Sequence, residues 1–144
     1  MTDYAKAAFD FKARLTAKTK RKADLDDFFE GVRVNIVKEV DKANIELARE
    51  GAPRVDLQQA SPHEHTIELV CRGASCKISQ DRSTPSIGAV VAGESGEKTI
   101  TFIILFEESP VTARRLSLTP ETEAKIDSAE LAASFVEELI IVAP

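Results

Sequence analysis

Residues 24–50, DLDDFFEGVRVNIVKEVDKANIELARE, decide the fold that we predict for this chain. Apolar residues repeat through this stretch with the spacing 4, 3, 4, 4, 3 and 4, and form one stripe: Leu25, Phe29, Val32, Ile36, Val40, Ala43 and Leu47. An amphipathic helix needs such spacing, and a strand cannot use it. We predict a main helix, roughly 40 Å long at 1.5 Å per residue, whose stripe is buried against a sheet or a second subunit.

Local signals mark both ends of this main helix. Asp24 is a candidate N-cap, and Gly51 followed by Pro53 predicts the end, because glycine takes the left-handed conformation and proline cannot continue a helix. Three ion pairs with i,i+3 spacing are expected on its surface: Glu30–Arg33, Glu39–Lys42 and Glu46–Arg49. A second apolar row lies nearly opposite the stripe and is a candidate partner face: Val34, Val37 and Ile45.

The residues before the main helix form a basic helical arm, residues 1–23. Apolar residues at helical spacing over 3–20 predict a first helix, and Asp24 favours two helices or one kinked helix. A single helix over 3–50 would be long for this chain and would lean on another subunit. Residues 1–22 hold seven Lys or Arg against two Asp, whereas residues 23–144 carry a net charge of −10. Nucleic acid is therefore an unlikely partner, since the acidic body repels phosphates.

From residue 54 the pattern changes to short strands separated by turns. Alternating or wholly apolar runs predict strands at 65–72, 75–81, 86–93, 98–108 and 113–118, and Val55 and Leu57 could open the sheet. Short connections predict antiparallel neighbours. Asp127 and Glu130 resemble a capping box that starts a closing helix over 127–141. The predicted fold is one α+β domain, residues 1–144, with helices on a meander of about five strands in two layers, the sheet spanning 54–118.

Composition places the chain among ordinary soluble proteins. Hydrophobic residues make up 43% and charged residues 30%, and no apolar run reaches the roughly 18 residues of a membrane span. The N-terminus has no secretory signal pattern. With only two cysteines, we expect a cytoplasmic protein whose thiols stay free.

His63 and His65 are the only candidate metal ligands, because they lie two apart on an extended segment. Cys71 is eight residues from His63, roughly 26 Å along a strand, so the three cannot share one ion. We expect no metal and no cofactor. A two-residue turn at Gly73 and Ala74 would set Cys71 opposite Cys76, where a disulfide could form in oxidising solution. We favour two buried, reduced thiols instead.

The sequence leaves several functions open. The first is a homo-oligomeric protein-interaction or adaptor module without catalysis, which partners itself as a homodimer or binds another protein, because apolar surface is left over. The alternative is an apolar-ligand-binding domain with a pocket between sheet and main helix, lined by Phe28, Phe29, Phe102 and Phe106. Whether the chain is an enzyme is not decided, and the balance is against it. We find no catalytic motif and nominate no catalytic or cofactor-binding residue.

Overall fold

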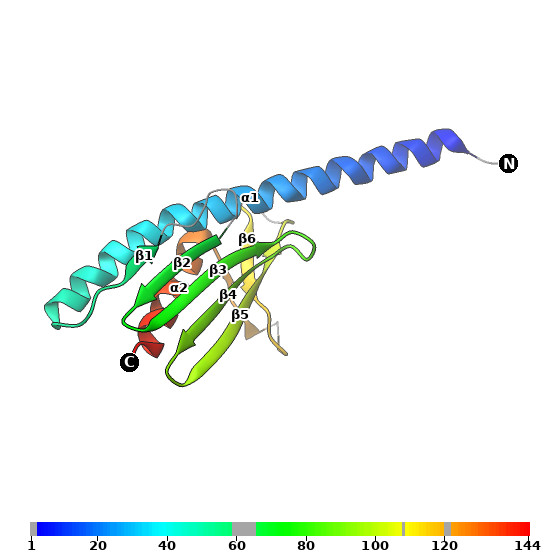
Figure 1. Ribbon diagram of the computed structural model, residues 1–144. Coiled ribbons are helices and arrows are strands. Elements are labelled where there is room, and N and C mark those ends of the chain that lie inside the picture. The colour runs from blue at the N-terminus through cyan, green and yellow to red at the C-terminus, as the bar shows by residue number, and fades with distance from the viewer. Residues whose placement is uncertain (1–2, 59–65, 108, 120–121) are drawn as a thin grey trace.

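A computed structural model of the chain describes residues 3–58, 66–107, 109–119 and 122–144. Two helices lie on an antiparallel sheet of seven strands (Figure 1), so the α+β prediction is confirmed. The elements in chain order are α1 (Tyr4–Arg49), β1 (Asp56–Gln58), β2 (Thr66–Cys71), β3 (Ala74–Asp81), β4 (Ser86–Gly93), β5 (Gly96–Leu105), β6 (Thr112–Arg115), β7 (Lys125–Ile126) and α2 (Ser128–Val142).

The N-terminal half of the chain forms one uninterrupted helix, α1, which spans 46 residues. The expected break before Asp24 is wrong. Its N-cap is Asp3, whose carboxylate accepts a hydrogen bond from the Lys6 backbone N–H at 3.0 Å. Asp24 lies inside the helix, because residues 20–25, KRKADL, contain no Gly or Pro and are mostly strong helix formers. A capping residue type therefore does not start a helix when helix formers precede it.

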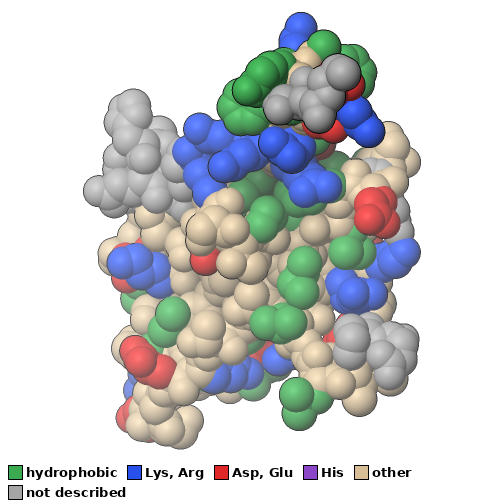
Figure 2. All heavy atoms as spheres, turned by 90° about the vertical axis from the view of Figure 1, so that its right-hand side faces the viewer, with side chains coloured by type: hydrophobic (Ala, Val, Ile, Leu, Met, Phe, Trp, Pro, Cys, Tyr) green, Lys and Arg blue, Asp and Glu red, His purple; other side chains and the backbone are tan. Residues whose placement is uncertain are grey.

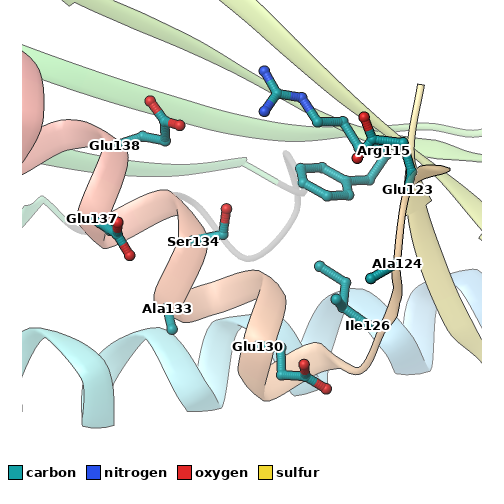
Figure 3. A pocket seen from close by; sticks show the side chains of 10 residues that line it. Arg115, Glu123, Ala124, Ile126, Glu130, Ala133, Ser134, Glu137 and Glu138 are labelled. Atoms are coloured by element: carbon teal, nitrogen blue, oxygen red, sulfur yellow. The ribbon is translucent and has the colours of Figure 1, made fainter. Parts of the chain in front are cut away.

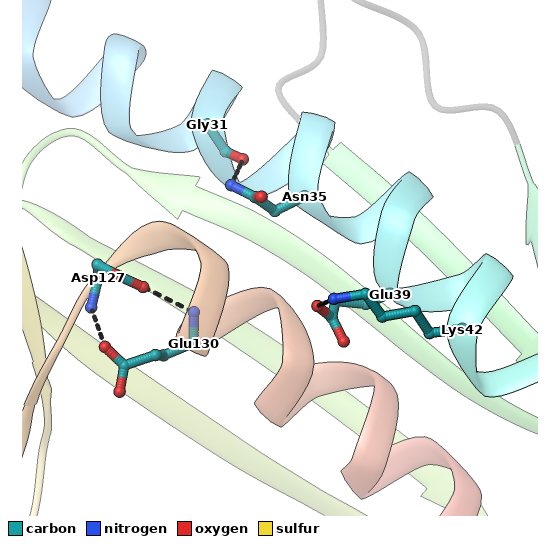
Figure 4. Close-up of polar contacts among 6 residues, drawn as sticks. All are labelled: Gly31, Asn35, Glu39, Lys42, Asp127 and Glu130. Atoms are coloured by element: carbon teal, nitrogen blue, oxygen red, sulfur yellow. Dashed lines mark hydrogen bonds and ion pairs between the residues drawn. The ribbon is translucent and has the colours of Figure 1, made fainter.

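The predicted end and surface pairs of α1 are confirmed. The helix ends at Arg49, and Gly51 has a φ of +65°, the left-handed conformation that glycine adopts freely. All three expected ion pairs form, with nitrogen–oxygen distances of 3.2, 3.2 and 2.7 Å in chain order. Figure 4 shows the Glu39–Lys42 pair, which projects from the surface of α1.

The sheet is a simple meander in the order β1 to β7, with every neighbouring pair antiparallel. The sheet has seven strands, two more than the five that we expected. The three residues of β1 confirm the opening at residue 57, and β7 escaped prediction because two residues show no alternation. The last predicted strand ends early, at Arg115, and its remaining residues continue as an irregular segment.

The core lies between one face of this sheet and the two helices. Alternate residues of β2 to β6 are buried on that face, as the period-2 pattern requires. From α1 the core receives the predicted stripe, with Leu25, Phe29, Val32, Ile36 and Val40 buried. Phe135 of α2 meets Phe102 of β5 edge to face, with ring centroids 5.8 Å apart. The closing helix is therefore packed directly on β5, the longest strand described.

The two helices approach closely at Gly31. A Cβ atom there would lie 3.0 Å from the Ser128 hydroxyl, so only glycine fits without displacing the start of α2. One turn later, the Asn35 amide donates to the Gly31 carbonyl at 2.8 Å and to the Ser128 hydroxyl at 3.4 Å. The predicted capping box is present: Asp127 and Glu130 exchange hydrogen bonds of 2.8 and 3.3 Å (Figure 4). These contacts set where α2 begins against α1.

Asn44 ties the far end of α1 to the chain that enters β1. Its amide donates to the Val55 carbonyl at 3.0 Å, and its side-chain oxygen accepts from the Val55 N–H at 2.7 Å. Val55 is fully buried, so its backbone groups have no access to water. The side chain therefore satisfies both groups as a neighbouring strand would.

We predict that Asn44→Ala lowers the free energy of unfolding by about 2–3 kcal/mol, since it leaves a buried donor and a buried acceptor unpaired. Urea denaturation followed by far-UV circular dichroism measures the change. The matched control is Asp41→Ala, an exposed position on the same turn, which should change stability by less than about 0.5 kcal/mol. Equal effects of the two substitutions would contradict a role for the Asn44 contact.

Candidate functional site

The most unusual feature of the molecule is the first half of α1, which projects from the body into solvent (Figure 1). We call residues 4–23 the arm; every one of them is exposed. Its large apolar side chains have exposed fractions of 78% for Tyr4, 74% for Phe9, 56% for Phe11 and 49% for Leu15. Figure 2 views the molecule from the arm's end and shows hydrophobic side chains gathered there.

Part of this apolar surface continues the stripe that enters the core. Phe11 precedes the buried Leu25 by fourteen residues, and Leu15 precedes the buried Phe29 by the same number. Because a straight helix drifts only about 20° per seven residues, these side chains lie on nearly the same side of α1 as the core stripe. Phe9 lies on the opposite side. The arm is thus built like a core helix but has no core to enter.

The arm is also strongly basic. It holds seven Lys or Arg against Asp10 alone. In the described part of the chain, none of these cations forms an ion pair, and Arg14 instead lies 6.0 Å from the Phe11 ring centroid. Like charges at i,i+4, such as Arg14, Lys18 and Lys22, repel one another along the helix. Contact with an acidic partner would relieve this repulsion and stabilise the arm.

A basic crevice of about 850 Å³ separates the arm from the β3–β4 hairpin. Arg14, Lys18, Arg21 and Lys22 line its arm side, and Ser83 and Pro85 line the hairpin side. Figure 2 shows a group of Lys and Arg side chains between the end of the arm and the body. Arg82 also lines the crevice and pairs with Asp26 at 3.1 Å, which holds the hairpin against α1.

A second hollow, of about 440 Å³, lies on the other flank of α2 (Figure 3). We call it the acidic cleft. Phe102 of β5 and Arg115 of β6 line it from the sheet. Its two walls come from α2 and from the segment through β7. The lining residues of the walls are Glu130, Ala133, Ser134, Glu137 and Glu138 on α2, and Glu123, Ala124 and Ile126 opposite them. The cleft is therefore lined at its floor by one aromatic ring and one guanidinium, and its walls carry acidic side chains.

Four carboxylates and one guanidinium give the cleft a net negative charge. Glu138 pairs with Lys98 at 2.5 Å, and Glu130 is used in the cap of α2. Glu123 and Glu137 make no hydrogen bond or ion pair with another described residue, so their charges are free to meet a ligand. Sequence reasoning missed this site because its residues come from separate elements and share no local pattern.

The four residues that we predicted as a pocket lie in the hydrophobic core or pack against it. Phe28 and Phe29 are buried in the core, and Phe106 packs partly buried against it. Phe102 alone lines a described cleft, the acidic one. The predicted partner row is exposed on α1, with exposed fractions of 49% for Val34, 47% for Val37 and 56% for Ile45. His63 and His65 lie outside the described residues.

The two cysteines do not face each other across the strands, and the alternative that we favoured, two buried and unpaired cysteines, is the one observed. The turn residues are Arg72 and Gly73, both with positive φ, so Cys71 pairs with Ala74 and Cys76 with Leu69. Both thiols are free and buried. Burial is the main cause that raises the pKa of Cys76 to about 12, and the nearby Glu138 carboxylate adds to it. The pKa of Cys71 is also raised, mainly by burial and to a smaller extent by the Asp56 carboxylate. Neither thiol has the low pKa that a nucleophile requires.

Among the described residues, no group of three or more His, Cys, Asp or Glu side chains is placed to hold a metal ion. No helix in the described part of the chain is long and apolar enough to cross a membrane.

We predict that neither cysteine of the folded protein reacts rapidly with a thiol reagent at pH 8, and that both react after unfolding in urea. Ser95→Cys places a thiol in the exposed β4–β5 turn and should react within the mixing time. Because the folded pKa values lie above the ordinary value of 9, unfolding also becomes easier as the pH rises above 9. Rapid labelling of the native protein would contradict this assignment.

Comparison with known proteins adds no relative to this picture. No family model, no curated protein and no solved structure matches the chain. Function therefore has to be inferred from the molecule itself, and its two distinctive surfaces are a basic, apolar arm and an acidic cleft.

Proposed function

We propose that the protein is a homo-oligomeric interaction module without catalysis, and that the arm makes its principal contact. The observation that carries this proposal is the exposure of Tyr4, Phe9, Phe11 and Leu15 on an ordered helix. Soluble monomers seldom leave a row of large apolar side chains uncovered, such as Tyr4, Phe11 and Leu15 on one side of the arm. An interaction partner removes it from water.

The geometry of α1 makes that partner a separate molecule. The helix is continuous through residues 20–25, so the arm cannot fold back on its own body without breaking backbone hydrogen bonds. A helix of about 20 residues with repelling cations is also marginal in isolation, because most helix stability in proteins comes from tertiary packing. Both its apolar side chains and its charges favour contact in trans.

A second copy of the chain has the right charge for this contact. Residues 24–144 hold twenty-two acids against twelve Lys or Arg, whereas the arm has a net charge of +6. Opposite charges steer association and fix its register. The same distribution disfavours nucleic acid, because the acidic body repels the phosphates that the arm attracts.

An apolar-ligand-binding domain is the second candidate. What supports it is the presence of apolar side chains, Phe102, Ala133 and Ile126, in the lining of the cleft. Three features weigh against it: the rims are acidic, the cleft is open, and the other predicted pocket residues are packed in the core or against it. A mass adduct on protein purified without added ligands would favour this function.

We expect native mass spectrometry and light scattering to find a dimer of the wild-type chain. Phe11→Ser with Leu15→Ser should raise the dissociation constant at least about 30-fold, since each side chain loses about 1.5–3 kcal/mol of burial when fully covered. Circular dichroism should show unchanged helix content of the body.

The matched control is Val34→Ser with Val37→Ser, which removes apolar surface of similar exposure from the row predicted as a partner face. We expect a change of less than about threefold. A dimer that responds to the control pair and ignores the arm pair would move the contact to that row. A wild type that stays monomeric at every concentration would overturn the proposed function.

A further inference from the structure

We infer that the arm of one copy docks in the acidic cleft of a second copy, so that two chains exchange arms. This inference rests on the proposed function and names the surface that receives the arm. The occupant to which we commit is residues 4–15 of the partner, which include the apolar side chains and Lys6, Lys12 and Arg14.

The cleft is an unfilled position in the helical layer. α2 lies across the middle strands, and α1 packs on one flank of α2. On the other flank, Arg115 of β6 is exposed on the inner face of the sheet, whereas Phe102 beside it on β5 is already covered by Phe135 of α2. Figure 3 shows α2 on one side of this gap and the segment through Ile126 on the other. Another helix placed there would complete the layer over the sheet.

The lining of the cleft suits the particular pattern of the arm. Apolar atoms lie on the floor at Phe102 and on opposite walls at Ala133 and Ile126. The arm likewise presents apolar side chains on two sides, with Phe11 on one and Phe9 on the other. A helix that lies on a flat membrane surface needs a single apolar face instead. The arm is thus shaped for insertion between walls.

Charge complementarity supports the acidic cleft as the surface that receives the arm. Glu123 and Glu137 stand on its opposite walls and are unpaired within the described structure. Lys6 and Lys12 of the arm have no ion pair either among the described residues. Arg115 on the floor opposes the cations, but the four carboxylates outnumber it. The unpaired cations of each arm therefore meet the unpaired carboxylates of the partner's cleft.

Exchange of arms also satisfies the symmetry of a dimer. Each chain carries one arm and one cleft, and the rigid helix keeps its own arm away from its own cleft. A two-fold arrangement fills both clefts with both arms and leaves no arm over. The contact closes at two chains.

The test uses two charge-reversed full-length chains. The arm variant carries Lys6→Glu and Lys12→Glu, and the cleft variant carries Glu123→Lys and Glu137→Lys. All four positions are exposed or lie at the cleft rim, and none belongs to the core or to the α2 cap. Native mass spectrometry distinguishes the two chains by mass.

Alone, each variant should dimerise at least tenfold more weakly than the wild type, because like charges meet at both contacts. Mixed in equal amounts, the two variants should form a heterodimer with near wild-type affinity. In that mixture the reversed arm meets the reversed cleft, and the native arm meets the native cleft.

The control is Glu94→Lys in the β4–β5 turn with Glu97→Lys at the start of β5, which makes the same charge change at exposed positions that do not line the cleft. It should dimerise like the wild type. A cleft variant that dimerises normally would overturn arm docking in the cleft while leaving the proposed function intact, as for arms that pack on each other. A monomeric wild type, including one that binds only anionic vesicles or a DNA duplex, would overturn both.

Discussion

The structure depends on the burial of one helical stripe, from Leu25 to Val40, against α2 and the sheet. Gly31 lets α2 begin in direct contact with α1, and Asn44 joins the end of α1 to the strand that opens the meander. These contacts order the second half of α1. Because helix formation is cooperative along an unbroken backbone, that order extends into the arm.

The consequence is a continuous helical arm that exposes large apolar side chains, as a core helix would, and carries a net positive charge. A flexible arm could hide its apolar side chains or fold back on the acidic body. A continuous helix can do neither, so the cost of exposing Tyr4, Phe9, Phe11 and Leu15 is relieved only by another molecule. Separation of basic arm and acidic body within one chain then makes a second copy the partner of matching charge.

Predictions from local sequence patterns were wrong where the same pattern is compatible with two different structures. Asp24 is a good cap and is also tolerated inside a helix, and only the residues around it decide between these. The turn after β2 could be placed at 72–73 or 73–74, and one residue of slip removed the expected opposition of Cys71 and Cys76. The two residues of β7 carry no period at all, and pair with β6 because the segment before α2 passes beside it.

The sequence by itself determined the α+β class, the stripe on α1, the antiparallel order of the strands and the helix end at Gly51, because each follows from spacing or backbone preference along the chain. It also revealed the basic arm, since charge can be counted. The continuity of α1 was also encoded locally, by the helix formers around Asp24, although the capping signal pointed the other way. Tertiary structure alone decided the acidic cleft. The cleft joins Phe102, Glu123 and Glu137 across the fold, and no local rule connects residues that meet only when the sheet and α2 pack together.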